Sequence, residues 1–132
     1  MAKLTAEMRD FIEKEREPSM VFVGTSNKDG IPNIAPKGTF ISILDDETMA
    51  YADVYSLKTI ENVRQNPHVT IAVINAKTFK GYQLKGLAEV VEGGPILEEA
   101  RKQNPQVNSV TKVKIQEVYL LDYGPQAGKK MA

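Results

Sequence analysis

The sequence predicts a mainly β protein: a small antiparallel barrel of six strands with short flanking helices. Three observations support this prediction. Most apolar segments alternate with the period of two that is typical of strands, turn residues separate them, and only short segments have helical periodicity. A parallel, doubly wound sheet would require more helix between successive strands. The antiparallel arrangement is therefore favoured.

The composition is that of an ordinary folded protein, and we expect a single domain over residues 1–132. Seventeen basic residues balance seventeen acidic ones, so no overall positive field favours nucleic acid or anionic lipid. Cysteine is absent, which excludes disulfides, thiolate catalysis and Cys-ligated metals. The longest apolar run, residues 71–74, is too short to cross a bilayer. A cytoplasmic protein that does not use a membrane is expected.

The N-terminal residues 1–17 predict an amphipathic helix that packs on the core. Thr5 is a suitable N-cap, and Pro18 follows the segment. Apolar residues recur at helical spacing, with charges on the opposite face. These apolar residues are Leu4, Met8, Phe11 and Ile12.

Two strands joined by a tight turn follow the first helix. The first strand covers residues 20–25, and Asn27-Lys28-Asp29-Gly30 forms the turn, with Gly30 free to adopt a positive φ. The returning residues 31–38 contain two prolines, which cannot donate to a β ladder. This second strand is therefore expected at an edge of the sheet.

The remainder of the chain alternates strands with two short helices and ends in a tail over residues 125–132. One helix follows Ser56 and stops at Asn66-Pro67, and another begins at Gly94-Pro95. Gly86 predicts a bulge in its strand. The strands are expected at residues 39–44, 48–53, 68–75, 81–91 and 110–123.

The helix that follows Ser56 has an unusual charge in its first turn. Lys58 opposes the helix macrodipole there, at a cost of up to about 1 kcal/mol. Free backbone N–H groups, the hydroxyls of Ser56 and Thr59 and the Lys58 ammonium would together bind a phosphate group. For the helix alone, a solvated lysine at an exposed end is the simpler interpretation.

A second segment could form the wall of the same site. Residues 34–39 form an irregular strand in which Pro36 releases backbone groups from the ladder, and Gly38 allows a flat ligand to approach closely. Residues 52–59 contain the possible phosphate site. A ligand with a planar head and a phosphate tail would use both segments.

Other chemistry has little support in the sequence. His68 is the only histidine, so Ser–His catalysis and a transition-metal site lack partners, and neither a catalytic residue nor a metal site is predicted. The Asp45-Asp46-Glu47 cluster is more simply a hairpin turn. Lysines near Phe79 and Tyr82 leave single-stranded nucleic acid as an alternative ligand, which the balanced charge disfavours.

In order and spacing, these motifs resemble the FMN-binding split-barrel proteins related to pyridoxamine 5'-phosphate oxidase. The resemblance covers about residues 11–122 and implies a split β-barrel. The shared pattern consists of Asp29-Gly30-Ile31-Pro32, Asn33-Ile34-Ala35-Pro36-Lys37, Ser56-Leu57-Lys58-Thr59, Asn62-Val63, Asn66-Pro67-His68-Val69 and the strand over residues 81–90.

The resemblance implies a homodimer with FMN bound at the subunit interface. Lys58 and Thr59, with help from Ser56, would hold the FMN phosphate, and Leu57 belongs to the same turn. Lys37 would stabilise negative charge on the reduced flavin if its side chain points inward. The residues that would line the ribityl chain and the ring are Ala35, Pro36, Lys37, Gly38 and Asp53.

The implied function is that of a small oxidoreductase that passes hydride or electrons through FMN, with NADH or NADPH as a candidate donor. A non-enzymatic FMN carrier or electron-transfer protein is the alternative, and a flavin-free barrel that binds nucleic acid or protein is the third interpretation. Oxidation of pyridoxamine phosphate is not expected, because the oxidase itself has arginines on barrel strands. Here all four arginines lie on predicted helices: Arg9, Arg16, Arg64 and Arg101.

Overall fold

The structure is a computed structural model that describes residues 2–15, 20–37 and 41–132, without the side chain of residue 15. Its first part contains α1 (Ala6–Asp10), the π-helical turn η1 (Phe11–Glu15), β1 (Met20–Ser26), β2 (Pro32–Pro36), β3 (Ile41–Asp45) and β4 (Thr48–Asp53). Its second part contains α2 (Leu57–Gln65), β5 (His68–Asn75), β6 (Lys80–Val91), α3 (Pro95–Gln103) and β7 (Ser109–Leu120).

Within the described residues, seven antiparallel strands form one sheet in the order β2-β1-β5-β6-β7-β4-β3. The predicted class, a mainly β antiparallel barrel with short helices, is confirmed. The sheet has seven strands where a barrel of six was predicted, because all seven segments expected as strands take part in it. The irregular return segment completes a ladder with β1 in spite of its two prolines, so that Pro36 pairs with Phe22 and Pro32 with Ser26. Its position at the sheet edge agrees with the prediction.

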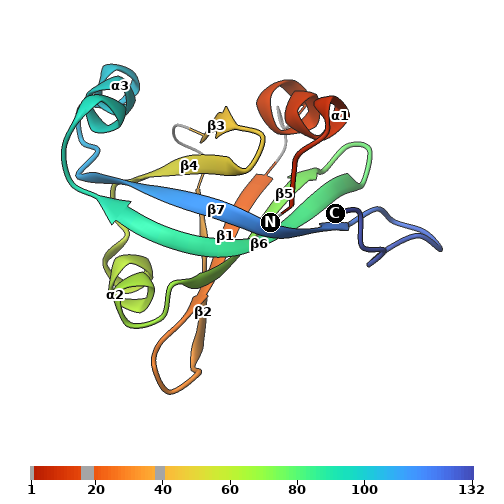
Figure 1. Ribbon diagram of the computed structural model, residues 1–132, viewed down its shortest axis with the longest axis horizontal. Helices are drawn as coiled ribbons and strands as arrows, with labels where there is room; N and C mark the ends of the chain where they lie inside the picture. The colour runs from red at the N-terminus through yellow and green to blue at the C-terminus, as the bar shows by residue number, and fades with distance from the viewer. Residues whose placement is uncertain (1, 16–19, 38–40) are drawn as a thin grey trace.

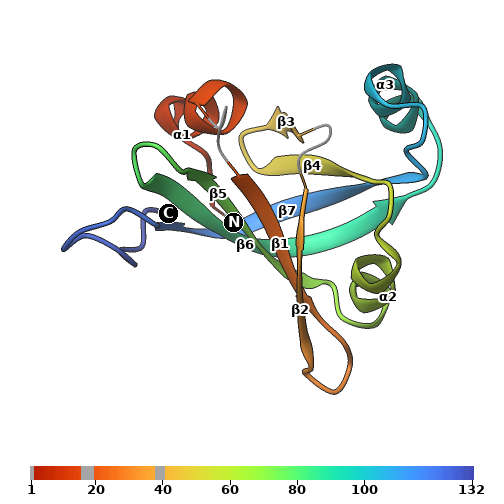
Figure 2. The same ribbon diagram turned by 180° about the vertical axis from the view of Figure 1, so that it is seen from behind.

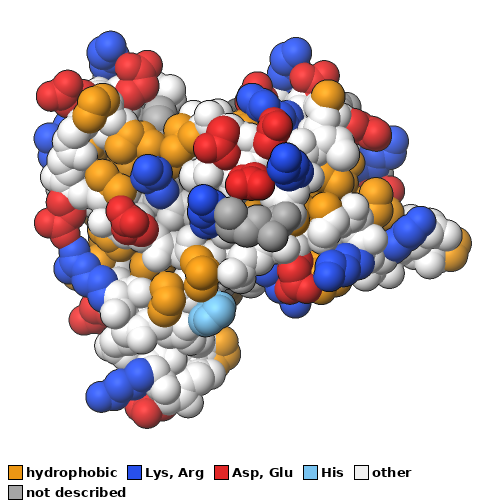
Figure 3. Space-filling model, in the orientation of Figure 1, with side chains coloured by type: hydrophobic (Ala, Val, Ile, Leu, Met, Phe, Trp, Pro, Cys, Tyr) orange, Lys and Arg blue, Asp and Glu red, His pale blue; other side chains and the backbone are white. Residues whose placement is uncertain are grey.

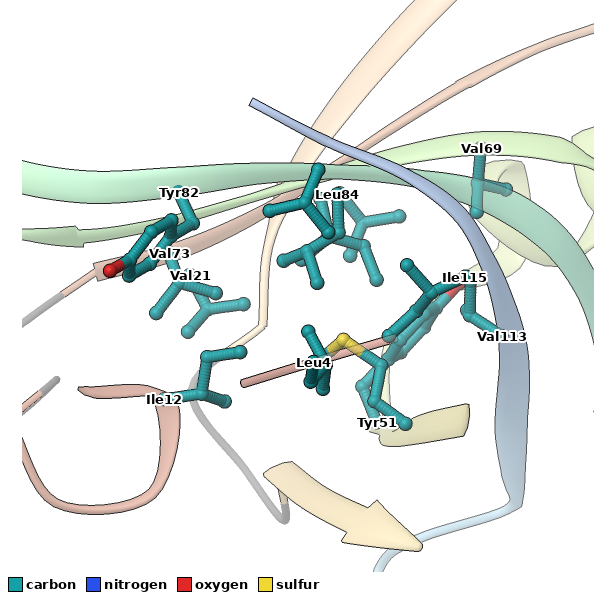
Figure 4. Packing of buried hydrophobic residues seen from close by; sticks show 14 of the residues in the cluster. Leu4, Ile12, Val21, Tyr51, Val69, Val73, Tyr82, Leu84, Val113 and Ile115 are labelled. Atoms are coloured by element: carbon teal, nitrogen blue, oxygen red, sulfur yellow. The ribbon is translucent and has the colours of Figure 1, made fainter. Parts of the chain in front are cut away.

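The sheet curls around one hydrophobic core (Figures 1 and 2). Figure 4 shows side chains of the N-terminal segment and of several strands pointing toward one another in this core, among them Leu4, Ile12, Val21, Tyr51, Leu84 and Ile115. The N-terminal helix packs there as predicted, since Leu4, Met8, Phe11 and Ile12 are all buried. Thr5 is its N-cap and accepts a hydrogen bond from the Met8 N–H at 3.2 Å.

The helices α2 and α3 lie on opposite sides of the β6–β7 pair in both views (Figures 1 and 2). Helix α2 contacts β1, β2 and β6, whereas α3 covers β4 and β7 through a second small core. That core consists of Ala50, Ala52, Leu97, Ala100, Val107 and Val110. Both helices have nine residues, and in the part of the chain that the structure describes no helix is long and apolar enough to cross a membrane.

Two glycines have the roles that the sequence predicts. Gly30 has a φ of 81° in the β1–β2 turn, where the Asn27 side-chain oxygen accepts hydrogen bonds from the N–H groups of Asp29 at 2.9 Å and Ile31 at 3.0 Å. At Gly86, the register of β6 against β7 shifts between Lys85 and Gly86, which is the expected bulge.

The close approach of β7 to Gly86 predicts a large effect of one methyl group. A Cβ atom on Gly86 would lie 2.2 Å from the backbone oxygen of Lys114 and 2.9 Å from Cγ1 of Val113. We expect Gly86→Ala to lower the free energy of unfolding by about 1–3 kcal/mol, because the backbone must shift to admit the methyl group. Denaturant-induced unfolding followed by circular dichroism measures this loss.

Gly93→Ala is the matched control, since a Cβ atom there would meet no heavy atom within 4 Å beyond its chain neighbours. We expect this variant to unfold within about 0.5 kcal/mol of the parent protein. Equal losses in the two variants would contradict the close approach at Gly86.

Candidate functional site

A buried ion pair joins two distant parts of the sheet. Lys37 follows the edge strand β2, Asp53 is the last residue of β4, and four strands separate β2 from β4 in the sheet order. The Lys37 Nζ lies 3.4 Å from the Asp53 Oδ1, and the two side chains are 6% and 1% exposed. A pair buried so deeply is stable only when further hydrogen bonds compensate for its lost hydration.

Two hydroxyl groups of β7 provide hydrogen bonds to Asp53. Ser109 Oγ and Thr111 Oγ1 both donate to the Asp53 Oδ2, at 2.9 and 2.8 Å. They reach the carboxylate because Ser109 pairs with Asp53, and Thr111 with Tyr51, in the β4–β7 ladder. Each carboxylate oxygen therefore has its own partners, with Oδ1 facing Lys37 and Oδ2 facing β7.

The Lys37 ammonium has two further neighbours. It donates a hydrogen bond to the Ser56 hydroxyl, and it lies 5.4 Å from the centre of the Tyr51 ring, a distance that suits a cation–π contact. Burial lowers the pKa of Lys37, and the attraction of the Asp53 carboxylate opposes this change. The Lys37 side chain points inward, as it must if it is to act on a ligand bound here.

Tyr51 contributes a fully buried phenol to the cluster. Within the described residues its hydroxyl makes no hydrogen bond of normal geometry, although the Thr111 side chain lies close enough to influence it. Burial raises the pKa of the Tyr51 phenol well above its ordinary value, and the negative charge of Asp53 adds to the increase. The phenol is therefore a neutral polar group inside the cluster.

The beginning of α2 lacks the cap that its sequence predicts. Ser56 occupies the N-cap position, but its side chain makes no capping hydrogen bond, since the hydroxyl accepts from Lys37 instead. The first turn contains no acidic residue. Ser56 therefore leaves the first N–H groups of this helix uncapped, and within the described part of the chain no other side chain is found to accept from them.

The predicted site residues have different positions in the structure. Lys37, Asp53 and Ser56 are in contact with one another. Thr59, three residues after Ser56, is buried. Lys58 is 66% exposed and lies 3.3 Å from the Glu61 carboxylate. Ala35 is half-buried, Pro36 and Leu57 are exposed, and Gly38 lies outside the described residues.

Ser109 and Thr111 are members of the cluster that sequence reasoning missed. The core-facing positions of β7 that follow them are Val113 and Ile115, both fully buried. Two hydroxyl side chains on an otherwise apolar strand face were the available signal, because buried polar groups require a partner. That partner, Asp53, is more than 50 residues away in the chain.

Two hollows on the surface lie apart from this cluster. One of about 640 Å³ lies over β1, β5 and β6 and is lined by Ile34, His68 and Lys85 among others. The other, of about 650 Å³, lies between α3 and the sheet, next to Lys112. The predicted site residues line neither hollow.

Three of the residues considered for a single-stranded nucleic acid surface have different surroundings. Tyr82 is buried in the core, Phe79 is exposed in the β5–β6 turn, and Lys112 lies beside α3. Figure 3 shows basic and acidic side chains interspersed over the face that it presents. In the described part of the chain, no group of three or more His, Asp or Glu side chains could hold a metal ion.

The sheet is antiparallel and curled, helices flank it, and β2 approaches β4 beside the N-terminus of α2. This is the architecture of a split-barrel protein. The family model described as pyridoxamine 5'-phosphate oxidase matches residues 4–122, and the chain belongs to this family. The resemblance stated from the sequence motifs is thereby confirmed.

Individual relatives agree with this assignment. The chain is 36% identical over 140 residues to an uncharacterized protein of Methanocaldococcus jannaschii, and the match covers 100% of this chain and 90% of that protein. The crystal structure of Group A Streptococcus HupZ has a TM-score of 0.78 at 28% identity and covers 95% of this chain and 99% of its own. An FMN-binding protein from Syntrophomonas wolfei has the same fold, with a TM-score of 0.75 at 16% identity and coverage of 89% and 86%.

Removal of one partner of the buried ion pair tests its role in holding the sheet ends together. We expect Lys37→Met and Asp53→Asn each to lower the free energy of unfolding by about 3–5 kcal/mol. The first change leaves the Asp53 carboxylate buried without its counterion, and the second leaves the Lys37 ammonium buried without one. The double variant should lose less than the sum of the two. Denaturant unfolding of all four proteins gives the coupling free energy.

Lys102→Ala is a suitable control for the lysine change. Lys102 also lies near a carboxylate, at 3.3 Å from Glu99, but it is 75% exposed. Its removal should change the stability by less than about 0.5 kcal/mol. A loss in Lys37→Met no larger than this would show that the buried pair does not stabilise the fold.

Proposed function

We propose that this protein binds FMN at the cluster of Lys37, Asp53 and Ser56 and acts as a small FMN-dependent oxidoreductase. One observation carries the proposal: the Ser56 hydroxyl is bonded to Lys37, so the first turn of α2 is left uncapped. Membership of the pyridoxamine 5'-phosphate oxidase family and the fold shared with an FMN-binding protein support it.

The groups at the start of α2 suit the FMN phosphate. The open N–H groups of the first turn, including that of Thr59, point donors at an anion, and the helix dipole favours negative charge there. Lys58 adds an ammonium group, whose exposed contact with Glu61 is weak enough for a phosphate to displace. Phosphate binding would explain why a lysine, not an acidic residue, occupies this turn.

The remaining predicted contacts belong to the ribityl chain and the ring. Ala35, Pro36, Lys37 and Gly38 would form one wall, and Asp53 would lie behind Lys37. FMN supplies hydride and single-electron chemistry when it is bound, and the protein supplies binding, orientation and charge. The Lys37 ammonium is the positive group that this chain offers near the ring, and Asp53 reduces its effect.

We further propose a homodimer with FMN at the subunit interface. A second copy would complete the enclosure of the ligand, and an exposed apolar surface for such a contact lies next to Lys37. Ile31, just before β2, is 62% exposed, and Ile34, within β2, is 71% exposed. Burial of these side chains against a second copy would be favourable and would bring a second wall to the ligand.

We do not propose pyridoxamine phosphate as the substrate. The arginines within the described residues bond elsewhere: Arg9 to Asp46 at 2.8 Å, Arg64 to Glu92, and Arg101 to the Val107 carbonyl at 2.9 Å.

NADH or NADPH is the proposed electron donor. A non-enzymatic FMN carrier is the second candidate, which the mutual neutralisation of Lys37 and Asp53 favours. Anaerobic bleaching of the bound flavin by NADH or NADPH would distinguish the enzyme from the carrier.

Titration with FMN and with riboflavin, followed by flavin fluorescence, tests the proposed cofactor site. The parent protein should bind FMN more tightly than riboflavin. Lys58→Ala should weaken FMN binding by about 1.5–3 kcal/mol, as for one charge-assisted hydrogen bond, and leave riboflavin binding unchanged. Lys102→Ala is the control, because Lys102 has a matching helix-surface contact at 3.3 Å far from the cluster in sequence.

The outcomes of this titration separate the parts of the proposal. Failure of the parent protein to take up FMN would rule out both the enzyme and the carrier. An equal loss of FMN and riboflavin affinity in Lys58→Ala would disprove the phosphate contact of Lys58 while leaving the cofactor in place.

Sedimentation velocity tests the homodimer. We expect a dimer for the parent protein and a shift to monomer for Ile34→Lys, with reduced FMN occupancy, because a buried lysine would be unpaired. Tyr123→Lys changes a side chain that is 91% exposed on a different element and should leave the dimer intact. A monomeric parent protein with full FMN occupancy would contradict an interfacial site.

A further inference from the structure

Ser109 and Thr111 are buried polar residues that the proposed FMN contacts do not include. They are 3% and 1% exposed and begin the core-facing side of β7, which continues with Val113 and Ile115. Apolar side chains would fill these positions without the cost of burying a hydroxyl group. Both hydroxyls instead donate to the same oxygen of Asp53.

A continuous series of contacts runs from β7 to helix α2. Ser109 and Thr111 bond to the Asp53 Oδ2 at 2.9 and 2.8 Å, and the Asp53 Oδ1 lies 3.4 Å from the Lys37 Nζ. Lys37 in turn donates to the Ser56 hydroxyl. Ser56 is the N-cap residue of α2, and its side chain makes no capping hydrogen bond.

We propose that Ser109 and Thr111 are positioning residues for the phosphate-binding turn: they orient Asp53 toward Lys37, and Lys37 keeps the Ser56 hydroxyl away from the N–H groups of α2. This inference rests on the proposed function, since it assigns these N–H groups to the FMN phosphate.

Competition for the same donors makes the position of the Ser56 hydroxyl important. Serine is among the preferred N-cap residues, and its oxygen accepts from the second or third residue of the helix, here Lys58 or Thr59. Those N–H groups are the ones that a phosphate at the helix end requires. Ser56 now has φ −117° and ψ 31°, outside the extended region usual for an N-cap residue. Once released from Lys37, it would cap the helix after its backbone turned to that conformation, and its hydroxyl would then compete with the phosphate.

The two β7 hydroxyls also hold the negative partner of Lys37 in place. Their hydrogen bonds fix the Asp53 carboxylate, whose attraction for the Lys37 ammonium opposes the lowering of the Lys37 pKa by burial. Without these hydroxyls, the buried carboxylate of Asp53 would lose two of its hydrogen bonds. Its position would no longer be fixed, and neither would the direction in which it holds Lys37. The contact of Lys37 with Ser56 would weaken as a result.

A purely structural role of Ser109 and Thr111 makes a different prediction. If these residues only stabilised the curled sheet, their removal would lower the stability and weaken the binding of FMN and riboflavin together. A positioning role changes the part of the affinity that depends on the phosphate. The ratio of FMN affinity to riboflavin affinity therefore distinguishes the two roles.

The test uses the full chain with Ser109→Ala and Thr111→Val combined. We expect the ratio of FMN to riboflavin affinity to fall by about tenfold relative to the parent protein, the effect of losing about one strong contact. The conservative pair Ser109→Thr and Thr111→Ser keeps both hydroxyls and should keep the ratio. If the combined variant does not fold, Ser109→Ala alone removes one hydrogen bond and should show a smaller fall.

A second measurement does not depend on FMN. In the free protein, nuclear magnetic resonance should show shifted amide signals for Lys58 and Thr59 in the combined variant, because Ser56 then caps them, and unchanged signals in the conservative pair. Unchanged Lys58 and Thr59 signals in the combined variant would overturn the positioning role. An unchanged affinity ratio in a protein that binds FMN would also overturn it, whereas failure of the parent protein to bind FMN would refute the proposed function alone.

Discussion

The contact between Lys37 and Asp53 joins the edge strand β2 to β4, which lies next to the opposite edge of the sheet. In the sheet order β2-β1-β5-β6-β7-β4-β3, each strand is held to its neighbours by a ladder, but among the described residues no ladder links β2 to β4. Curling of the sheet brings the two together, and the buried ammonium and carboxylate meet at the junction. Apolar side chains of similar volume could fill such a junction at no loss of stability. The charges are therefore better explained by the chemistry beside them than by the fold.

Comparison of two helices of this chain shows where the sequence departs from the usual rules. Helix α1 has a threonine cap, Glu7 in its first turn and Arg9 in its last, all favourable for the dipole. Helix α2 has the favourable Arg64 in its last turn, but its N-terminus combines an uncapped serine position with Lys58. Unfavourable local choices concentrated at one helix end are expected at a functional site and not in a helix that serves packing alone.

Local patterns predicted the elements well because their causes are local. The bounds of β4 and β5 agree with the predicted residues 48–53 and 68–75, and the bulge at Gly86 follows from the missing side chain. The contact of Asp53 with Ser109 and Thr111 could not be found in this way, since it depends on the register of β4 against β7. The direction of Lys37 was open for another reason: two prolines left the pairing of this segment uncertain, whereas in the structure exposed and half-buried positions alternate along β2 and the buried Lys37 follows them.

The arrangement of charges suggests which end of the proposed ligand provides the specificity. At the ring end, the ammonium of Lys37 is compensated by Asp53 at 3.4 Å, so the pair exerts a weaker field on a flavin than an unpaired lysine would. At the phosphate end, the open N–H groups of α2 and the exposed Lys58 have no buried negative partner. Recognition of FMN over riboflavin would thus depend on α2, whereas the buried pair would act mainly through geometry. The contact of Asp53 with Lys37 would then have two consequences. It weakens the field of the Lys37 ammonium at the flavin, and it directs that ammonium toward the Ser56 hydroxyl.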